Sequence, residues 1–175
     1  RMVTDAITDY FFLFLELANE NLRRNGAGDE QIFLVGNVMI DTLLKHRPNF
    51  KKPSIWDKLE LKEKGFIVMT LHRPANVDAD NKLKSLLNEI VAHSGDLPLI
   101  FPVHPRTAKI IDSLGISYTR LHMIDPLGYL EFNYLVERAK AVITDSGGIT
   151  EETSVMGVPC MTLRDNTERP ETTTL

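Results

Sequence analysis

Five short segments of the sequence carry side chains that can bind or transfer charged groups, and each segment follows an apolar run. Imidazole rings can act as acids, bases or donors to phosphate, and guanidinium groups place paired donors on phosphate oxygens. Glycines beside a serine let a ligand approach the backbone closely. Together these residue types indicate a site for an anionic ligand. The segments are Leu71-His72-Arg73-Pro74, Val103-His104-Pro105-Arg106, Asp125-Pro126-Leu127-Gly128, Thr144-Asp145-Ser146-Gly147-Gly148 and Arg164-Asp165-Asn166-Thr167-Glu168-Arg169-Pro170.

The clearest signal is Ser146-Gly147-Gly148, which lies between an expected strand and an expected helix. The two glycines leave the backbone accessible, and the first-turn N–H groups of the next helix would face a ligand. Ser146 adds a hydroxyl, so the segment predicts a phosphate cradle. A tight turn with close helix packing would need the same glycines, and the pattern is neither a Walker A loop nor a dinucleotide-binding GxGxxG. Both interpretations stay open from the pattern alone.

Two charged residues also have a functional and a structural interpretation. Glu152, in the first turns of the helix after the glycines, either accepts hydrogen bonds from ribose hydroxyls or balances the helix dipole. Arg169 either places its guanidinium on a diphosphate or forms a surface salt bridge with Glu168 or Glu171.

Two histidines and two apolar residues lie at the same expected edge. His72 and His104 occupy equivalent strand ends, where each could serve as an acid, a base, a phosphate donor or a structural side chain. Leu127 and Phe132 either pack in the core or cover a nucleotide base. Arg73 lies on the same edge.

The elements that must position these residues alternate between apolar runs and helix-like patterns. The runs are short, nearly continuous and rich in Val, Ile and Phe, as is typical of strands covered on both faces. Strand, helix and strand at this spacing predict βαβ units and a parallel sheet in an α/β fold. Ligands of such sheets bind outside the carboxyl ends of the strands. The expected strands are 66–71, 97–103, 121–124, 141–144 and 158–163, and the expected helices are 80–93, 106–114, 129–139 and 149–156.

The first part of the chain predicts one long amphipathic helix that ends at Gly26, because apolar residues recur three and four positions apart. Residues 31–35 then predict a strand and residues 38–45 a short helix. The polar stretch 47–53, with two prolines, predicts a linker. The apolar positions of the expected long helix are Ile7, Phe11, Phe14, Leu15, Ala18 and Leu22.

The composition excludes several classes of protein. Among 175 residues, 20 Lys and Arg stand against 24 Asp and Glu, so no broad cationic surface for duplex nucleic acid is expected. The single Cys160 excludes a disulfide framework and a multi-cysteine zinc site within one chain, and we expect it to be buried. No residues show metal-ligand spacing. No apolar run approaches the ~18 residues that span a bilayer, and we expect a cytoplasmic protein.

Five longer motifs occur together and in order along the sequence. They are Thr70-Leu71-His72-Arg73-Pro74-Ala75-Asn76-Val77-Asp78, Phe101-Pro102-Val103-His104-Pro105-Arg106, Asp125-Pro126-Leu127-Gly128-Tyr129-Leu130, Thr144-Asp145-Ser146-Gly147-Gly148-Ile149-Thr150-Glu151-Glu152 and Asn166-Thr167-Glu168-Arg169-Pro170-Glu171. In this combination the sequence resembles the non-hydrolysing UDP-N-acetylglucosamine 2-epimerases. Val35-Gly36-Asn37 with Ile40-Asp41-Thr42 also resembles the interdomain region of that family, so the resemblance covers essentially the whole chain.

The resemblance implies a GT-B-like α/β fold, in which two Rossmann-like domains face each other across a cleft. Because the sequence opens at Arg1 without an initiator methionine, we expect a segment of a longer polypeptide. Residues 1–45 would form the C-terminal part of the first domain and residues 46–64 a linker with a helix. Residues 65–175 would form the second, UDP-binding domain, incomplete at its C-terminus. We expect a homodimer that binds UDP-N-acetylglucosamine and UDP, and neither nucleic acid nor a membrane.

The family interconverts UDP-N-acetylglucosamine and UDP-N-acetylmannosamine, which feeds surface polysaccharide synthesis in bacteria, and it needs no redox cofactor. UDP is eliminated to leave a 2-acetamidoglucal and is then added back with the opposite configuration at C2. By this resemblance His72 would contact the nucleotide sugar and support the chemistry, and Glu152 would hold the ribose. Arg169 would bind the nucleotide phosphate or partners across the cleft. The diphosphate and the adjoining sugar would lie against Ser146, Gly147 and Gly148.

Other positions match the family in part. Leu127 and Phe132 would flank the uracil, and Arg73 and His104 resemble positions near a second, regulatory nucleotide-sugar site. Many members carry Glu where this sequence has Ala75, so any role of that carboxylate is absent here.

The acid–base carboxylates of the family belong to the first domain, in a part that would precede Arg1. We therefore expect this polypeptide alone to bind UDP weakly and to turn nothing over. Two other functions remain open from the sequence. One is a catalytically silent UDP-sugar binding module, and the other is a hydrolysing 2-epimerase that releases UDP and free N-acetylmannosamine.

Overall fold

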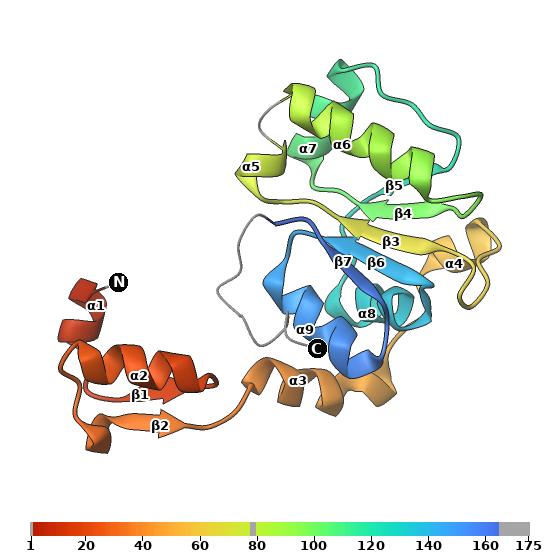
Figure 1. Ribbon diagram of the computed structural model, residues 1–175. Helices are drawn as coiled ribbons and strands as arrows, with labels where there is room; N and C mark the ends of the chain where they lie inside the picture. Colours follow the sequence, from red (N-terminus) through yellow and green to blue (C-terminus); the bar gives the residue numbers. More distant parts are fainter. Residues whose placement is uncertain (1, 78–79, 165–175) are drawn as a thin grey trace. The chain divides into compact units, whose positions relative to one another are not determined.

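The computed structural model describes residues 2–77 and 80–164, and it divides the chain into two compact units (Figure 1). The first unit is Arg1–Lys45 and the second is His46–Leu175. Among the described residues, no helix combines the length and the apolar character needed to cross a membrane.

The second unit is built on a parallel sheet, which within the described residues has the strand order β5-β4-β3-β6-β7. Every neighbouring pair in the sheet is parallel. The βαβ alternation expected from the sequence is therefore confirmed. The strands are β3 (Ile67–Thr70), β4 (Leu99–Pro102), β5 (Leu121–Ile124), β6 (Ala141–Thr144) and β7 (Cys160–Thr162).

Helices cover both faces of this sheet. In Figure 1, α6 and α7 lie on one face, and α8 and α9 lie on the other. All four of these helices were expected from the sequence and are confirmed. The short α5 was not expected; it begins at Pro74, a residue favoured in the first turn of a helix. The helices are α4 (Ser54–Lys58), α5 (Pro74–Val77), α6 (Asp80–His93), α7 (Pro105–Ser113), α8 (Tyr129–Arg138) and α9 (Gly147–Met156), with a 3₁₀ turn η2 (Arg47–Asn49) before them.

Successive side chains of a strand point to opposite faces of the sheet, so the core is divided into two clusters. Met69 and Phe101 pack in a cluster with residues of α6 and α7. Their chain neighbours Val68 and Ile100 pack in the other cluster, with residues of α8. Both faces of the central strands are therefore apolar, which explains why the sequence shows continuous apolar runs there and no polar alternation.

The strand order reverses between β3 and β6. Starting at β3, the chain first adds β4 and β5 on one side, and then returns to add β6 and β7 on the other side. In open α/β sheets, ligands bind in the crevice outside the carboxyl ends of the strands at such a reversal. The loop after β3 carries His72, and the loop after β6 leads into Ser146-Gly147-Gly148. Two of the predicted segments therefore meet at the expected position of a ligand.

In the first unit, the prediction of a single long helix is wrong. The chain instead forms α1 (Met2–Ala6), β1 (Phe11–Leu13) and α2 (Glu16–Arg24). β1 pairs in parallel with β2 (Ile32–Leu34). A short run of aromatic and apolar residues fits both helical and strand spacing, and the pairing with β2 decides in favour of the strand.

The other secondary-structure predictions for this unit are confirmed. Gly26 follows the end of α2 with a φ of +93°, a left-handed conformation that favours glycine. The strand expected over 31–35 is β2, and the helix expected over 38–45 is α3 (Val38–His46). A 3₁₀ turn, η1 (Asp29–Gln31), leads into β2.

The β1–β2 pair exposes large apolar side chains. Phe12 is 67% exposed and Phe33 is 42% exposed, and their rings stack with centroids 5.4 Å apart. Leu34 and Val35 are also exposed. Parallel sheets are normally covered on both faces, so the exposure of these side chains is unusual for a parallel pair.

We expect Gly157→Ala to lower the free energy of unfolding by about 1–2 kcal/mol. Gly157 ends α9 with a φ of +69°, and an added Cβ would meet no atom within 4 Å, so the cost comes from the backbone conformation alone. Gly128→Ala is the matched control, because Gly128 has a φ of −64° and its Cβ would lie 3.8 Å from Glu131 Oε2, an ordinary contact. Urea unfolding followed by circular dichroism measures both. Equal effects at the two positions would contradict the explanation.

Candidate functional site

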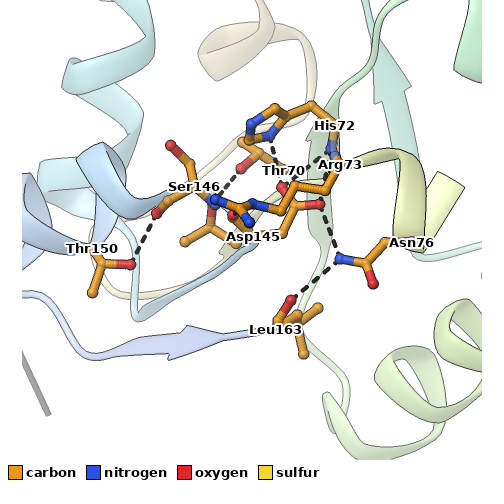
Figure 2. Close-up of polar contacts among 9 residues, drawn as sticks. Thr70, His72, Arg73, Asn76, Asp145, Ser146, Thr150 and Leu163 are labelled. Atoms are coloured by element: carbon orange, nitrogen blue, oxygen red, sulfur yellow. Dashed lines mark hydrogen bonds and ion pairs between the residues drawn. The ribbon is translucent and has the colours of Figure 1, made fainter. Parts of the chain in front are cut away.

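A buried carboxylate, Asp145, lies at the centre of the strand reversal (Figure 2). Its side chain is 0% exposed, and it directly follows β6. The backbone N–H of His72 donates to Oδ2 at 3.1 Å and to Oδ1 at 3.2 Å, and the backbone N–H of Arg73 donates to Oδ2 at 2.9 Å. The side-chain amide of Asn76 donates to Oδ2 at 3.1 Å. Asp145 thereby fixes the loop after β3 against the loop after β6.

Further hydrogen bonds hold the same loops together. Arg73 Nε donates to the backbone carbonyl of Asp145 at 2.9 Å, and Asn76 Nδ2 donates to the backbone carbonyl of Leu163 at 3.2 Å. At the strand ends, the hydroxyls of Thr70 and Thr144 lie 2.6 Å apart. The ends of β3, β6 and β7 are therefore joined into one polar cluster, which gives the edge of the sheet a defined geometry.

The imidazole of His72 is held by the same carboxylate. Its Nδ1 lies 2.7 Å from Asp145 Oδ1, while the His72 side chain as a whole is 61% exposed. In Figure 2 the ring lies over Asp145, in the direction away from Asn76. One ring nitrogen therefore contacts a buried carboxyl group, and the rest of the ring is accessible to a ligand.

The N-terminus of α9 lies beside this pair. Ser146 is the residue before the helix, and its backbone N–H donates to Thr144 Oγ1 at 3.0 Å. Its hydroxyl does not cap the helix, so it is available to another partner. The first amides of a helix, here those of Gly147 and Gly148, have no partner within the helix and attract anions. The arrangement fits the phosphate cradle predicted from the sequence.

A second carboxylate, Glu152, is buried one turn into α9. The Tyr129 hydroxyl, from the first residue of α8, donates to Glu152 Oε1 at 2.9 Å. Burial raises the pKa of the Glu152 carboxyl above its ordinary value; the hydrogen bond from Tyr129 opposes this increase, and the nearby Glu151 adds to it. Burial also raises the pKa of the Tyr129 hydroxyl, and the hydrogen bond to Glu152 raises it further. One oxygen of Glu152 is thereby occupied by a fixed donor.

The described residues contain no group of three or more His, Cys, Asp or Glu side chains placed to hold a metal ion.

Comparison with known proteins places this geometry in a family. The family profile described as UDP-N-acetylglucosamine 2-epimerase matches residues 1–174. The chain belongs to the UDP-N-acetylglucosamine 2-epimerase family. This confirms the family that the motifs of the sequence resemble.

Individual relatives match nearly the whole chain. The UDP-N-acetylglucosamine 2-epimerase of Methanocaldococcus jannaschii is 38% identical over an alignment of 183 residues. The alignment covers 98% of this chain and 50% of the relative. The UDP-2,3-diacetamido-2,3-dideoxy-D-glucuronate 2-epimerase of Pseudomonas aeruginosa is 38% identical over 179 residues, 99% of this chain and 49% of the relative. The chain spans about half the length of the curated relatives it matches.

Solved structures agree with these relatives. The crystal structure of the M. jannaschii UDP-GlcNAc 2-epimerase in complex with UDP-GlcNAc and UDP is 38% identical and has a TM-score of 0.85, covering 99% of this chain and 50% of that one. The UDP-GlcNAc 2-epimerase from Neisseria meningitidis bound to UDP-GlcNAc is 28% identical with a TM-score of 0.80, covering 99% and 49%. The GT-B-like α/β fold expected from the sequence is confirmed.

Within this epimerase-family chain, only some of the site residues predicted from the sequence meet at Asp145. His72 and the α9 N-terminus, with Ser146, meet at Asp145. His104 lies directly before α7, where its Nδ1 accepts a hydrogen bond from the Arg106 backbone N–H at 3.4 Å and so caps the helix. Arg169 lies outside the described residues.

Leu127 and Phe132 are half-buried and pack against the core cluster on the α8 face, so each also keeps an exposed part. Cys160 was expected to be buried, but it is only half-buried, because β7 is at the edge of the described sheet. Arg73, which the resemblance to the family places near a regulatory site, donates through Nε to the backbone carbonyl of Asp145.

Sequence reasoning missed Asp145 and Tyr129. Both stood in the quoted motifs, but neither was given a role. The position of Asp145, directly after a strand buried on both faces, could have indicated a buried carboxylate that needs several donors. Tyr129 gave no signal, because its contact with Glu152 depends on how α8 lies beside α9.

The Glu152 carboxyl should make stability depend on pH. The folded protein holds the proton of Glu152 more tightly than the unfolded chain, so the contribution of this group is most favourable at low pH. It falls as the pH rises from the ordinary pKa of 4.5 through the raised pKa. Urea unfolding across this interval should show the wild type losing stability relative to Glu152→Gln. Tyr129→Phe should make the fall steeper, because it removes the hydrogen bond that opposes the increase in pKa. A difference between wild type and Glu152→Gln that stays constant or grows in favour of the wild type would contradict this account.

Proposed function

We propose that the protein to which this chain belongs is a UDP-N-acetylglucosamine 2-epimerase, which interconverts UDP-N-acetylglucosamine and UDP-N-acetylmannosamine. The observation that carries the proposal is the placement of an exposed, anchored imidazole beside a glycine-rich helix N-terminus at the strand reversal, in a chain of this family. Its similarity to a structure that holds UDP-GlcNAc and UDP supports the choice of ligand.

The binding residues follow from the site geometry. The diphosphate lies at the N-terminus of α9, where backbone N–H groups and the Ser146 hydroxyl can donate to it. Glu152, held at one oxygen by Tyr129, accepts from a ribose hydroxyl with the other. The exposed parts of Leu127 and Phe132 flank the uracil. The resemblance to the family, and not the geometry, supports the remaining roles: Arg169 adds a guanidinium to the phosphates, and Arg73 and His104 lie near a second, regulatory nucleotide-sugar site.

The proposed reaction breaks and re-forms the bond between C1 and the diphosphate oxygen. A base removes the proton at C2, the electron pair forms the C1–C2 double bond of 2-acetamidoglucal, and the C1–O pair leaves with UDP. In the second half, UDP adds back to C1 and a proton returns to the opposite face of C2. Negative charge grows on the diphosphate as the C1–O bond breaks, so donors fixed at that position stabilise the transition state. His72 lies in the loop next to those donors and supports this step.

The first unit is proposed to be the C-terminal part of the first Rossmann-like domain, over residues 1–45. The exposed apolar surface of the parallel β1–β2 pair supports this, because a larger sheet would cover it. Residues 46–64 then form the linker with α4, and residues 65–175 the UDP-binding domain. The acid–base carboxylates are proposed to come from the first domain.

The resemblance to the family also supports three statements about the whole protein. It is a homodimer, it acts in the cytoplasm, and it supplies precursors for surface polysaccharides.

A second substrate is favoured by one observation. The P. aeruginosa relative, at 38% identity, is named for a diacetamido glucuronate in place of N-acetylglucosamine. Both substrates are UDP sugars with an acetamido group at C2, so the elimination chemistry is the same for the two.

A time course by proton NMR in deuterium oxide tests the proposal on the intact protein. UDP-N-acetylglucosamine should convert to a mixture with UDP-N-acetylmannosamine that carries deuterium at C2, without accumulating UDP. Conversion of only the diacetamido glucuronate nucleotide would reassign the substrate. Steady release of UDP with free N-acetylmannosamine would identify a hydrolysing epimerase, and binding without turnover would identify a silent UDP-sugar module.

A further inference from the structure

We propose that Asp145 is a positioning residue that keeps the proton of His72 on Nδ1 and directs Nε2 toward the bound nucleotide sugar. The identity of that ligand rests on the proposed function, but the position of the proton does not. The juxtaposition that carries the proposal is the 2.7 Å contact between His72 Nδ1 and the fully buried Oδ1 of Asp145.

The carboxylate itself is held in one orientation. Three N–H groups, the backbone amides of His72 and Arg73 and the side-chain amide of Asn76, donate to its oxygens at 2.9 to 3.2 Å. Both oxygens are engaged, so the group cannot rotate without breaking these bonds. A fixed acceptor oxygen therefore meets the ring nitrogen of His72.

The contact determines which ring nitrogen carries the proton. A carboxylate only accepts hydrogen bonds, so a bare lone pair on Nδ1 would face the oxygen of Asp145 at 2.7 Å and be repelled. Nδ1 is therefore the protonated nitrogen of the neutral ring. Nε2 then carries a lone pair that can accept a proton, and with a second proton it becomes a donor to a phosphate oxygen.

The connection between the two loops does not require the contact between His72 Nδ1 and Asp145 Oδ1. The three N–H donors are enough to join the loop after β3 to the loop after β6. The ring contact adds a bond to a side chain that is 61% exposed and that fills no core space. The extra contact has the geometry by which a carboxylate fixes the tautomer and the orientation of an imidazole at a reactive site.

The tautomer can be measured directly. In the intact protein with ¹⁵N-labelled histidine, long-range proton–nitrogen correlation spectra distinguish a protonated from an unprotonated ring nitrogen. The His72 signals are those missing from His72→Asn. We expect the neutral ring to carry its proton on Nδ1. Wild-type protein with the proton on Nε2 would overturn the proposal, whatever the outcome of the turnover assay.

Two variants distinguish the effect of Asp145 on the His72 ring from its effect on the connection between the two loops. Asp145→Asn should shift His72 toward the Nε2-protonated form, because the amide has one acceptor oxygen for three N–H donors and the ring. Asn76→Ala removes one donor but keeps the carboxylate, so it should lower stability and leave the His72 tautomer unchanged. An unchanged tautomer in folded Asp145→Asn, or a changed one in Asn76→Ala, would contradict the role of Asp145. If Asp145→Asn does not fold, the wild-type and Asn76→Ala spectra still decide.

A kinetic readout links the position of the proton to the reaction. If the intact protein is active, Asp145→Asn should lower kcat about 10²–10⁴-fold, the range of a general acid or base, with a smaller change in KM. An inactive wild-type protein would refute the proposed function and leave the tautomer result in place. An active protein with wild-type kcat in Asp145→Asn would refute the positioning role.

Discussion

Replacing Asp145 with alanine is expected to lower the free energy of unfolding by about 3–5 kcal/mol. The carboxylate is fully buried and accepts from three N–H groups, two on the backbone after β3 and one on Asn76. Alanine would leave these donors without a partner at a place that water reaches poorly. Equilibrium unfolding in urea, followed by far-ultraviolet circular dichroism, gives the change.

The matched control for this prediction is Asp125→Ala. Asp125 also directly follows a strand, β5, but its side chain is exposed, so its replacement should change stability by no more than about 0.5 kcal/mol. Similar losses for both variants would show that the burial of Asp145 is not what stabilises the fold.

Replacing His72 with asparagine is expected to lower kcat of the intact protein about 10²–10⁴-fold, the contribution typical of an acid–base group. The fold should be retained, because the His72 side chain is 61% exposed and asparagine can still donate to Asp145. The measurement is the initial rate of formation of UDP-N-acetylmannosamine, with unfolding curves to verify the fold.

His93→Asn serves as the control for a general effect of losing a histidine. His93 is the last residue of α6, where its Nδ1 contacts the Glu89 backbone carbonyl, and no role in the reaction is assigned to it. Its turnover should equal that of the wild type. A His72→Asn variant with wild-type kcat would remove His72 from the reaction and leave it a binding or structural role.

The parallel sheet was predictable because its central strands β3, β4 and β6 are buried on both faces. The stretch Phe66 to Met69 contains no polar residue, whereas an amphipathic helix or a strand with one exposed face would show polar residues at regular spacing, and glycines and prolines separate the runs. Once the strands and helices have been located along the chain, the residues at the carboxyl end of each strand are known as well. His72 and Ser146-Gly147-Gly148 could therefore be assigned to one edge of the sheet from the sequence alone.

Other features depend on contacts between distant segments, and local patterns do not contain them. The strand over Phe11–Leu13 exists because it pairs with Ile32–Leu34, and without that partner its spacing fits a helix equally well. The burial of Asp145 likewise depends on β6 lying directly beside β3, which follows from the strand order and not from the alternation of elements. The hydrogen bond between Tyr129 and Glu152 requires α8 and α9 to be neighbours.

The donors that hold Asp145 lie 73, 72 and 69 residues earlier in the chain. While the polypeptide is being synthesised, the segment around His72 leaves the ribosome well before its acceptor. The N–H groups of that segment lack the Asp145 carboxylate as acceptor until β4, β5 and β6 have been synthesised. Assembly of this edge of the sheet is therefore a late event in the maturation of the nascent chain. A stall or a truncation before Asp145 would yield strands that can pair but no imidazole in a defined orientation.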